Sequence, residues 1–223
     1  MTQDSEKRGR FVVLDGPDGG GKTTQVVHLA AWLSSRGHDV VTCHDPGGTP
    51  LGSRLRAILL DRDEVTRGIR AEMLLYMASR AQLVDEIIAP ALARGAFVVS
   101  DRYLLANIVY QGHAGGLGVE DVARVGLVTT RGLLPDLTVV LDVPVTTARS
   151  RVATSRDRIE DRPEAYHNAV REGFLAAVEA ARAGVCVYYP APIVRVDASG
   201  DPTDVRDAIR TEVARALAFD PRS

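Results

Sequence analysis

The 223-residue sequence has no apolar run that approaches the roughly 20 residues needed by a membrane-spanning helix. Its first ten residues are charged and contain no apolar segment, so we interpret residues 1–10 as a disordered tail and not as a secretory signal. The only cysteines, Cys43 and Cys186, lie far apart in hydrophobic stretches and fit no metal-ligand spacing. These absences predict a cytoplasmic protein with reduced core cysteines and no membrane partner.

Neither sign of charge is in large excess, because the formal net charge is −2. This balance argues against a nonspecific nucleic-acid-binding protein. Lysine is also rare, and Lys22 is the only lysine outside the predicted tail. The length and the ordinary share of hydrophobic residues, 45%, favour a single domain, which we place at residues 11–218.

Short, Val-rich segments alternate with longer helical patterns along the chain. Nearly continuous apolar segments of this length are typical of strands that are covered on both faces. We therefore predict an α/β fold with a parallel sheet of about five strands. The predicted strands are 11–15, 39–43, 97–101, 137–142 and 193–197. The predicted helices are 22–36, 70–94 (in which Pro90 should kink the helix or end its regular part), 119–131, 146–156, 163–182 and 203–217.

Residues 16–23 read Gly-Pro-Asp-Gly-Gly-Gly-Lys-Thr and fit the phosphate-binding pattern G-x-x-x-x-G-K-[ST], between a predicted strand and a predicted helix. Glycines let backbone N–H groups converge on phosphate oxygens, and the helix directs its positive dipole end at the same anions. Lys22 supplies a positive charge to the β- and γ-phosphates, and Thr23 offers a hydroxyl to Mg²⁺. An accidental lysine in a glycine-rich turn is the disfavoured alternative. The expected ATP-binding residues are Gly16, Pro17, Asp18, Gly19, Gly20, Gly21, Lys22, Thr23 and Thr24.

A phosphate cradle does not identify a reaction, because GTPases, ATP-driven motors and small-molecule kinases all use one. The sequence has no Asn-Lys-x-Asp guanine motif and is short for a motor. After the third predicted strand, the Asp101 carboxylate is suited to Mg²⁺ or its water, and the Arg102 guanidinium to an acceptor phosphate. An ordinary strand-end salt bridge is the alternative for this pair taken alone.

Four further segments accompany Asp101-Arg102-Tyr103: 45–49 (Asp-Pro-Gly-Gly-Thr), 72–82 (Glu-Met-Leu-Leu-Tyr-Met-Ala-Ser-Arg-Ala-Gln), 110–112 (Tyr-Gln-Gly) and 135–138 (Pro-Asp-Leu-Thr). In this order and spacing, the chain from residue 11 to about 217 resembles thymidylate kinases. The resemblance implies a three-layer P-loop kinase fold with a five-stranded parallel sheet and a short mobile lid at about 149–162. It also implies transfer of the γ-phosphoryl of ATP to dTMP with Mg²⁺ by a homodimer.

The resemblance also implies roles on the acceptor side. Tyr76 would stack near the thymine, and Arg80 would bind its edge from the same helix face, four residues further on. Arg102 would hold the dTMP phosphate. Asp18 would meet the sugar 3′-hydroxyl, and Tyr110 would crowd the 2′ position and disfavour ribonucleotides. The implied substrate-binding residues are Asp18, Asp45, Tyr76, Arg80, Arg102, Asn107, Tyr110 and Gln111.

The segment after the fourth predicted strand mixes arginines with carboxylates. Such a segment is usually a solvated helix face. The resemblance gives a second interpretation, because family members without a basic residue at the variable cradle positions supply arginine from the lid. The variable positions here, residues 17–20, carry no basic side chain. We therefore expect Arg156 or Arg158 to reach the transferring phosphoryl group, beside Lys22, Asp101 and Arg102 as the other catalytic residues.

Some positions depart from the family's pattern. His44-Asp45 stands where Arg-Glu is common, and Ala106 stands where a hydroxyl is often found. These departures concern the acceptor and leave the ATP cradle intact. A kinase for another pyrimidine deoxynucleoside monophosphate, dUMP or a 5-modified one, therefore stays an alternative. A non-catalytic ATP-dependent switch is the alternative from another class, although it gives no reason for Tyr76 and Arg102 to occur together.

Overall fold

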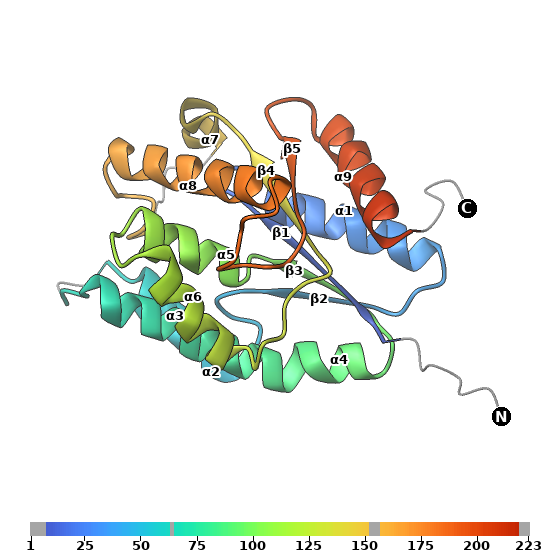
Figure 1. The fold of residues 1–223 in the computed structure, drawn as a ribbon, viewed down its shortest axis with the longest axis horizontal. Coiled ribbons are helices and arrows are strands. Elements are labelled where there is room, and N and C mark those ends of the chain that lie inside the picture. Colours follow the sequence, from blue (N-terminus) through green and yellow to red (C-terminus); the bar gives the residue numbers. More distant parts are fainter. Residues whose placement is uncertain (1–7, 63–64, 152–156, 219–223) are drawn as a thin grey trace.

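A parallel sheet forms the centre of the molecule. In a computed structural model, which describes residues 8–62, 65–151 and 157–218, five strands lie in the order β2-β3-β1-β4-β5 (Figure 1). The strands are β1 Arg10–Asp15, β2 Val40–His44, β3 Phe97–Asp101, β4 Leu137–Asp142 and β5 Ile193–Asp197. All four neighbouring pairs are parallel. The five predicted strands and the parallel sheet are confirmed, with shifts of one residue at β1 and β2.

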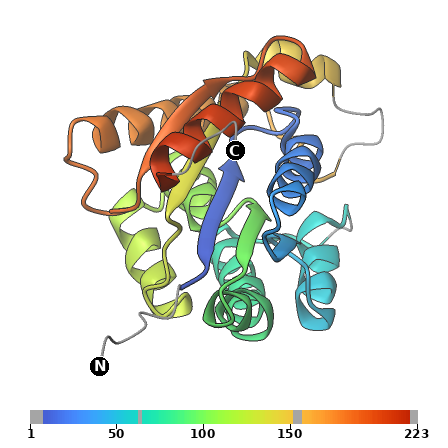
Figure 2. The same cartoon turned by 90° about the vertical axis from the view of Figure 1, so that its right-hand side faces the viewer.

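Helices cover both faces of this sheet and complete three layers, as the end-on view shows (Figure 2). Helices α1 Lys22–Ser35 and α9 Pro202–Leu217 pack together on one face, and α8 Glu164–Arg182 lies on the other. Successive residues of β1 explain the two faces, because strand side chains alternate. Val12 and Leu14 join the apolar cluster of α1 and α9, whereas Phe11 and Val13 join the cluster of α8.

The predicted helix 70–94 is divided in the structure. It consists of α3 Ile69–Leu83, a π-helical turn η1 Val84–Ile88 and α4 Ala89–Ala93. Pro90 has no N–H, so the regular ladder cannot continue through it, and the wide turn lies immediately before it. The remaining predicted helices are confirmed with small shifts as α6 Val119–Thr129, α7 Val145–Arg151, α8 and α9. The end of the predicted helix 146–156 lies outside the described residues.

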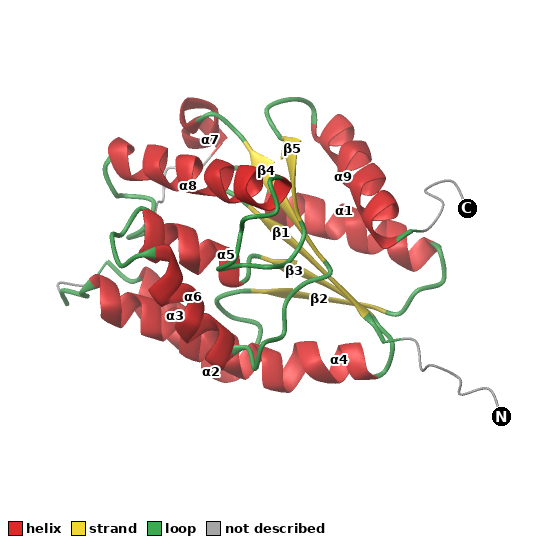
Figure 3. Cartoon of the chain, viewed as in Figure 1, coloured by secondary structure: helices red, strands yellow, loops and turns green. Residues whose placement is uncertain are grey.

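Two helical regions were not predicted (Figure 3). Helix α2 Pro50–Leu60 buries only Gly52 and Leu59, so its apolar pattern is weak, although Thr49 and Pro50 form a recognisable helix start. The Thr49 hydroxyl accepts the Gly52 N–H at 2.9 Å. The second region, α5 Leu104–Asn107 with the π-helical turn η2 Ile108–His113, is buried along most of its length and therefore has no amphipathic pattern.

The predicted tail, residues 1–10, overlaps the start of the described fold. Residues 1–7 lie outside the described part of the chain. The Gly9 N–H donates to the Leu92 carbonyl at 3.0 Å, and Arg10 begins β1 with an ion pair to Asp136 at 3.6 Å. Residues 9 and 10 therefore take part in the fold before the expected boundary at residue 11.

The structure also shows the state of the cysteines and the character of the described helices. Cys43 and Cys186 are both free and buried, as the hydrophobic surroundings of each predict. Within the described ranges, no helix combines the length and the apolar character that crossing a bilayer requires.

Candidate functional site

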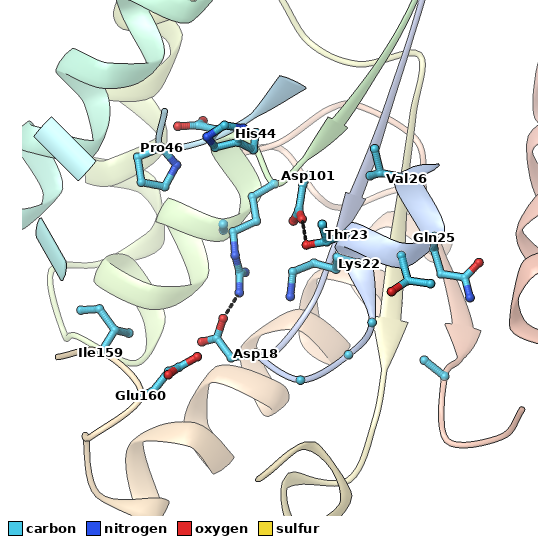
Figure 4. Close-up of a pocket in the computed structure, with 18 of the residues that line it drawn as sticks. Asp18, Lys22, Thr23, Gln25, Val26, His44, Pro46, Asp101, Ile159 and Glu160 are labelled. Carbon is cyan, nitrogen blue, oxygen red and sulfur yellow. Dashed lines mark hydrogen bonds and ion pairs between the residues drawn. The ribbon is translucent and has the colours of Figure 1, made fainter. Parts of the chain in front are cut away.

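A cavity of about 950 Å³ opens at the carboxyl ends of β1, β2 and β3. This is the edge where parallel α/β sheets present groups to ligands. The glycine-rich loop lies in its middle, and Figure 4 shows Lys22, Thr23 and Asp101 on one side with Ile159 and Glu160 across from them. One end of the cavity reaches Ala198 and Gly200. The other end, which we call the acceptor end, is lined by residues that the sequence analysis assigns to the acceptor. The lining residues of the acceptor end include Asp45, Tyr76, Arg80, Ala106, Tyr110 and Gln111.

The loop between β1 and α1 has a conformation that glycine permits. Gly16, Gly19 and Gly21 have φ values of 132°, 77° and 80°. A Cβ atom at Gly19 would lie 2.3 Å from the Ala148 carbonyl oxygen, so space as well as backbone angle excludes a side chain there. Helix α1 begins without a side-chain cap. Its first N–H groups therefore face the loop, as an anion-binding helix terminus requires.

Lys22 is buried at the bottom of the cradle. Its Nζ donates to the carbonyl oxygens of Gly16 at 3.1 Å and Pro17 at 2.7 Å. Burial and the Arg102 charge lower the Lys22 pKa to about 8, against the raising effect of Asp18 and other carboxylates. The two carbonyls hold the ammonium where a phosphate oxygen would replace them as its partner. Thr24, also in the cavity lining, is exposed.

Thr23 and Asp101 form a hydrogen-bonded pair of oxygen-bearing side chains beside the cradle. The Thr23 hydroxyl donates to Asp101 Oδ2 at 2.6 Å, although the two residues lie on α1 and β3 (Figure 4). A hydroxyl and a carboxylate are hard oxygen donors, which Mg²⁺ prefers, and it usually takes only one or two protein ligands and keeps several waters. The described residues contain no cluster of three or more His, Cys, Asp or Glu side chains that could hold a metal alone. The pair therefore fits Mg²⁺ bound together with phosphates.

Arg102 lies between the cradle and the acceptor side. Its guanidinium donates to the Gly16 carbonyl at 2.8 Å and to the Tyr110 hydroxyl at 3.2 Å, and it forms ion pairs with Asp18 and, at 3.4 Å, with Asp15. The backbone places it there at φ 69°, which is uncommon for a non-glycine residue. Arg102 therefore faces the cavity, where the sequence predicts an acceptor-phosphate ligand.

The two aspartates beside Arg102, Asp15 and Asp18, have pKa values that are shifted in opposite directions. Burial raises the Asp15 pKa to about 6, although Arg102 and the Gly16 N–H lower it. Burial also opposes ionisation of Asp18, but Arg102, Lys22 and the Tyr110 hydroxyl outweigh it and lower the Asp18 pKa to about 2. Asp18 accepts the Tyr110 hydroxyl at 2.9 Å. The ionised Asp18 thus holds Tyr110 and Arg102 together at the rim of the cradle.

The acceptor end is built around a buried arginine. Arg80 is 1% exposed, and its Nε donates to Asp45 Oδ2 at 2.5 Å, while its NH1 donates to Asn107 Oδ1 at 2.8 Å. Asn107 Nδ2 in turn donates to Gln111 Oε1 at 2.6 Å. Tyr76 is half-buried and lines the same end of the cavity. The structure therefore brings the five predicted residues of this end together.

Burial also raises the pKa of Asp45, against the lowering effect of Arg80. Among the described residues, nothing donates to Asp45 Oδ1, although this oxygen is buried. Asp45 therefore has one buried oxygen that accepts no hydrogen bond from the described residues.

The predicted lid arginines are placed differently. Arg156 lies outside the described residues. Arg158 does not contact the cradle, because its NH2 donates to Glu72 Oε2 at 2.5 Å and its Nε donates to the Leu59 carbonyl at 3.0 Å. Nearer the other end of the cavity, Arg151 donates to the carbonyls of Ala198 and Ser199, both at 2.8 Å.

Sequence reasoning gave no role to Glu72 and Arg151. Glu72 is fully buried and lies four residues before Tyr76, on the same face of α3. The sequence offered one signal for Glu72, because its carboxylate lies four residues before Tyr76 on the same helix face. Arg151 had no comparable signal, because nothing local places it against residues 198–199.

The fold and the site together define the class of protein. A strand, glycine loop and helix on a parallel sheet, with a hydroxyl–carboxylate pair beside them, form a P-loop site for a nucleoside triphosphate. The family model described as thymidylate kinase matches residues 14–197. The chain belongs to the thymidylate kinase family.

Named relatives extend this similarity over most of the chain. A thymidylate kinase of Caldanaerobacter subterraneus subsp. tengcongensis is 45% identical over 173 residues, which cover 77% of this chain and 83% of the relative. One of Clavibacter michiganensis subsp. michiganensis is 40% identical over 216 residues, covering 94% and 97%. One of an Exiguobacterium species is 38% identical over 203 residues, covering 90% and 92%.

Proposed function

We propose that this protein transfers the γ-phosphoryl group of ATP to dTMP and forms dTDP and ADP. The observation that carries the proposal is a single cavity that extends to both sides of the cradle, with Arg102 between the two sides. The end at Ala198 and Gly200 would take the nucleoside of ATP. The end at Tyr76 and Arg80 would take thymidine. The two phosphate chains would then meet between Lys22 and Arg102.

The acceptor oxygen needs no general base in this reaction. It belongs to a phosphate monoester, which is already anionic near neutral pH. The obstacle is the approach of two polyanions, whose repulsion is about 1 kcal/mol for each pair of unit charges at 4 Å in water and larger in a drier site. Lys22 and Arg102 would offset this repulsion and hold the reacting oxygens in line, so catalysis is positioning with electrostatic stabilisation.

Thr23 and Asp101 would hold Mg²⁺. The Thr23 hydroxyl would bind the ion, and the Asp101 carboxylate would bind it or one of its waters. When bound, Mg²⁺ neutralises negative charge on the β- and γ-phosphate oxygens. The contact between these two side chains at 2.6 Å supports the assignment, because it joins the two oxygens at the edge of the cradle.

A further arginine would complete the charge balance at the transferring phosphoryl group. Arg156 and Arg158 are the two candidates, since residues 17–20 of the cradle carry no basic side chain. Arg158 would have to break its ion pair with Glu72 to reach the cradle.

The proposal extends to the acceptor base and the sugar. Tyr76 and Arg80 would contact thymine, Asp18 the 3′-hydroxyl, and Tyr110 would crowd a 2′-hydroxyl. Asn107 and Gln111 would support this end, and Asp45 would keep Arg80 in place. The half-buried Tyr76 and the buried Arg80 at one end of the cavity support these roles.

Release of ADP with a panel of acceptors tests the proposal. With dTMP, dUMP, dCMP, GMP and AMP compared at equal concentration, dTMP should give the largest kcat/KM. A larger kcat/KM for dUMP than for dTMP would support the alternative pyrimidine kinase, for which His44 in place of the common arginine is the specific observation. Slow ATP hydrolysis that ignores every acceptor would indicate the switch instead.

We also propose that the protein is a cytoplasmic homodimer. Helix α2 packs against α3, and both present exposed apolar side chains, Leu51 and Ile58 on α2 and Leu74 on α3, with exposures of 46%, 47% and 54%. Burial of these side chains between two copies would remove apolar surface from water. Light scattering during gel filtration should give the mass of a dimer, and a monomer mass at micromolar concentration would contradict this.

A further inference from the structure

Glu72 is a fully buried carboxylate that the proposed chemistry does not use. Its Oε2 accepts hydrogen bonds from NH2 of Arg158 at 2.5 Å and from NH2 of Arg162 at 2.7 Å. Its Oε1 accepts one from Nε2 of Gln111 at 2.8 Å. The two oxygens of one carboxylate therefore connect the segment 157–163 to the acceptor end of the cavity.

The contacts continue from Gln111 without interruption. Gln111 accepts from Asn107, Asn107 accepts from Arg80, and Arg80 donates to Asp45 at the end of β2. The side chains from Glu72 to Asp45 are each at most 3% exposed. In such surroundings a change at one member alters the hydrogen bonds of the next, because each buried polar group depends on its neighbour as a partner.

The segment 157–163 also forms part of the cavity wall. Ile159 is 4% exposed, and Asp157, Ile159 and Glu160 line the cavity. Figure 4 shows Ile159 and Glu160 across the cavity from Lys22 and Thr23. Glu72 thus fixes, through two guanidinium groups, a segment whose position determines the shape of the site.

We infer that Glu72 is a positioning residue that couples occupation of the acceptor pocket to the placement of segment 157–163. The inference rests on the proposed function, since it assumes an acceptor nucleotide at the Arg80 and Gln111 end. A ligand that engages these side chains favours one arrangement of the amides, and Glu72 transmits that preference to Arg158 and Arg162. By linkage, the placed segment strengthens acceptor binding to the same degree.

Amide hydrogen exchange with added dTMP tests the coupling. In the unaltered protein, dTMP should slow exchange at the N–H groups of Arg158, Asp161 and Arg162, whose acceptors are carbonyls of Leu60, Asp157 and Ile159. Glu72→Gln keeps the shape of the side chain but removes the charge shared by the two guanidiniums. In this variant dTMP should no longer slow exchange in the segment when the protein is saturated with dTMP.

Steady-state kinetics supply a second measurement. Loss of a charge-assisted contact predicts a rise of about tenfold to a hundredfold in KM for dTMP in Glu72→Gln, with KM for ATP changed less than about twofold. The matched control is Asp161→Asn, which removes the exposed ion pair between Arg62 and Asp161 in the same segment. This control should keep both the exchange response and the dTMP KM.

If Glu72→Gln does not fold, Arg162→Gln decides the question. Arg162 is 19% exposed and shares Glu72 with Arg158, so its loss weakens the coupling without leaving Glu72 unpaired. It should raise the dTMP KM by about threefold to tenfold and reduce the exchange response.

A variant with unchanged dTMP-dependent protection and unchanged dTMP KM would overturn the inference. If the unaltered protein itself neither binds nor phosphorylates dTMP, the proposed function fails first, and the inference fails with it. The unaltered protein is measured in the same experiment, so the two failures are distinguishable.

Discussion

Arg102 has a backbone conformation that costs a non-glycine residue free energy. Its φ of 69° is held by two hydrogen bonds, from its N–H to the Leu14 carbonyl at 2.9 Å and from the Ser100 hydroxyl to its own carbonyl at 2.7 Å. Residues held in this way cost on the order of 1–3 kcal/mol and cluster at functional sites. Here the conformation places the guanidinium between Asp18 and the Gly16 carbonyl, where two phosphate groups would meet.

Arg102→Ala should abolish phosphorylation of dTMP while leaving ATP affinity nearly unchanged. The reason is that Arg102 would bind the acceptor phosphate, whereas Lys22 and the cradle would bind ATP. Calorimetric titration with a non-hydrolysable ATP analogue, together with a kinase assay, measures both effects. A large loss of affinity for the analogue would contradict an acceptor-side role.

Arg156→Ala and Arg158→Ala, made singly, should differ in their effects on kcat. An arginine that reaches the transferring phosphoryl group is worth about 10³–10⁵ in rate, so one of the two variants should lose activity of that order. If Arg158 instead keeps its ion pair with Glu72, kcat should fall in Arg156→Ala, and Arg158→Ala should mainly raise KM for dTMP. Unchanged kcat in both variants would show that neither residue reaches the phosphoryl group.

The raised pKa of Asp15 has a measurable effect on stability. A carboxyl whose pKa is about 6 in the folded protein and 3.8 unfolded favours folding when it is protonated, so this contribution is lost as pH rises through about 6. Asp15→Asn removes the cost of the buried charge. Asp15→Asn should therefore be more stable relative to the unaltered protein at pH 7.5 than at pH 4.5. The difference between the two free energies of unfolding should grow by about 2 kcal/mol in favour of Asp15→Asn.

Urea unfolding at the two pH values measures this difference. Asp18→Asn is the control, because the pKa of Asp18 is about 2 folded and 3.8 unfolded, both below pH 4.5. Its relative stability should change little between these pH values. Equal effects of Asp15→Asn at both pH values would contradict the raised pKa.

At the scale of elements, the loop before α1 depends on close approach to α7. Gly19→Ala adds a Cβ atom 2.3 Å from the Ala148 carbonyl, at a φ of 77°. Gly37→Ala is a matched control, since Gly37 has a φ of 81° but no atom within 4 Å of the added Cβ. Backbone strain of about 1 kcal/mol is common to both variants. Gly19→Ala should lower the free energy of unfolding further than Gly37→Ala and weaken ATP binding. Denaturant melts measure the first effect. Equal losses of unfolding free energy in the two variants would contradict the steric argument.

Secondary structure was predictable where one physical signal dominated. The strands are nearly continuous apolar segments, and α1 follows a phosphate-binding pattern, so both were predicted. Pro90 indicated an interruption, but the π-helical turn η1 depends on how the chain repacks before it. Helix α2 has an N-terminal cap in its sequence, yet it buries too few residues to show a clear periodic pattern.

At the scale of the whole molecule, the sheet brings distant segments to one edge. The carboxyl ends of β1, β2 and β3 place the cradle, His44 and Asp101 around one cavity, as a parallel sheet with helices on both faces predicts. The strand-end residues of the site could therefore be predicted from the sequence. The contact between Glu72 and Arg162 spans 90 positions and depends on packing of α3, so no local pattern indicated it.

The destination of the γ-phosphoryl group tests the central claim most directly. ATP labelled at that group is incubated with dTMP and Mg²⁺, and the labelled products are separated. Docking of two nucleotides on either side of Arg102 predicts that the label appears in dTDP, with one ADP formed for each dTDP. Label released as inorganic phosphate, at a rate independent of dTMP, would contradict it.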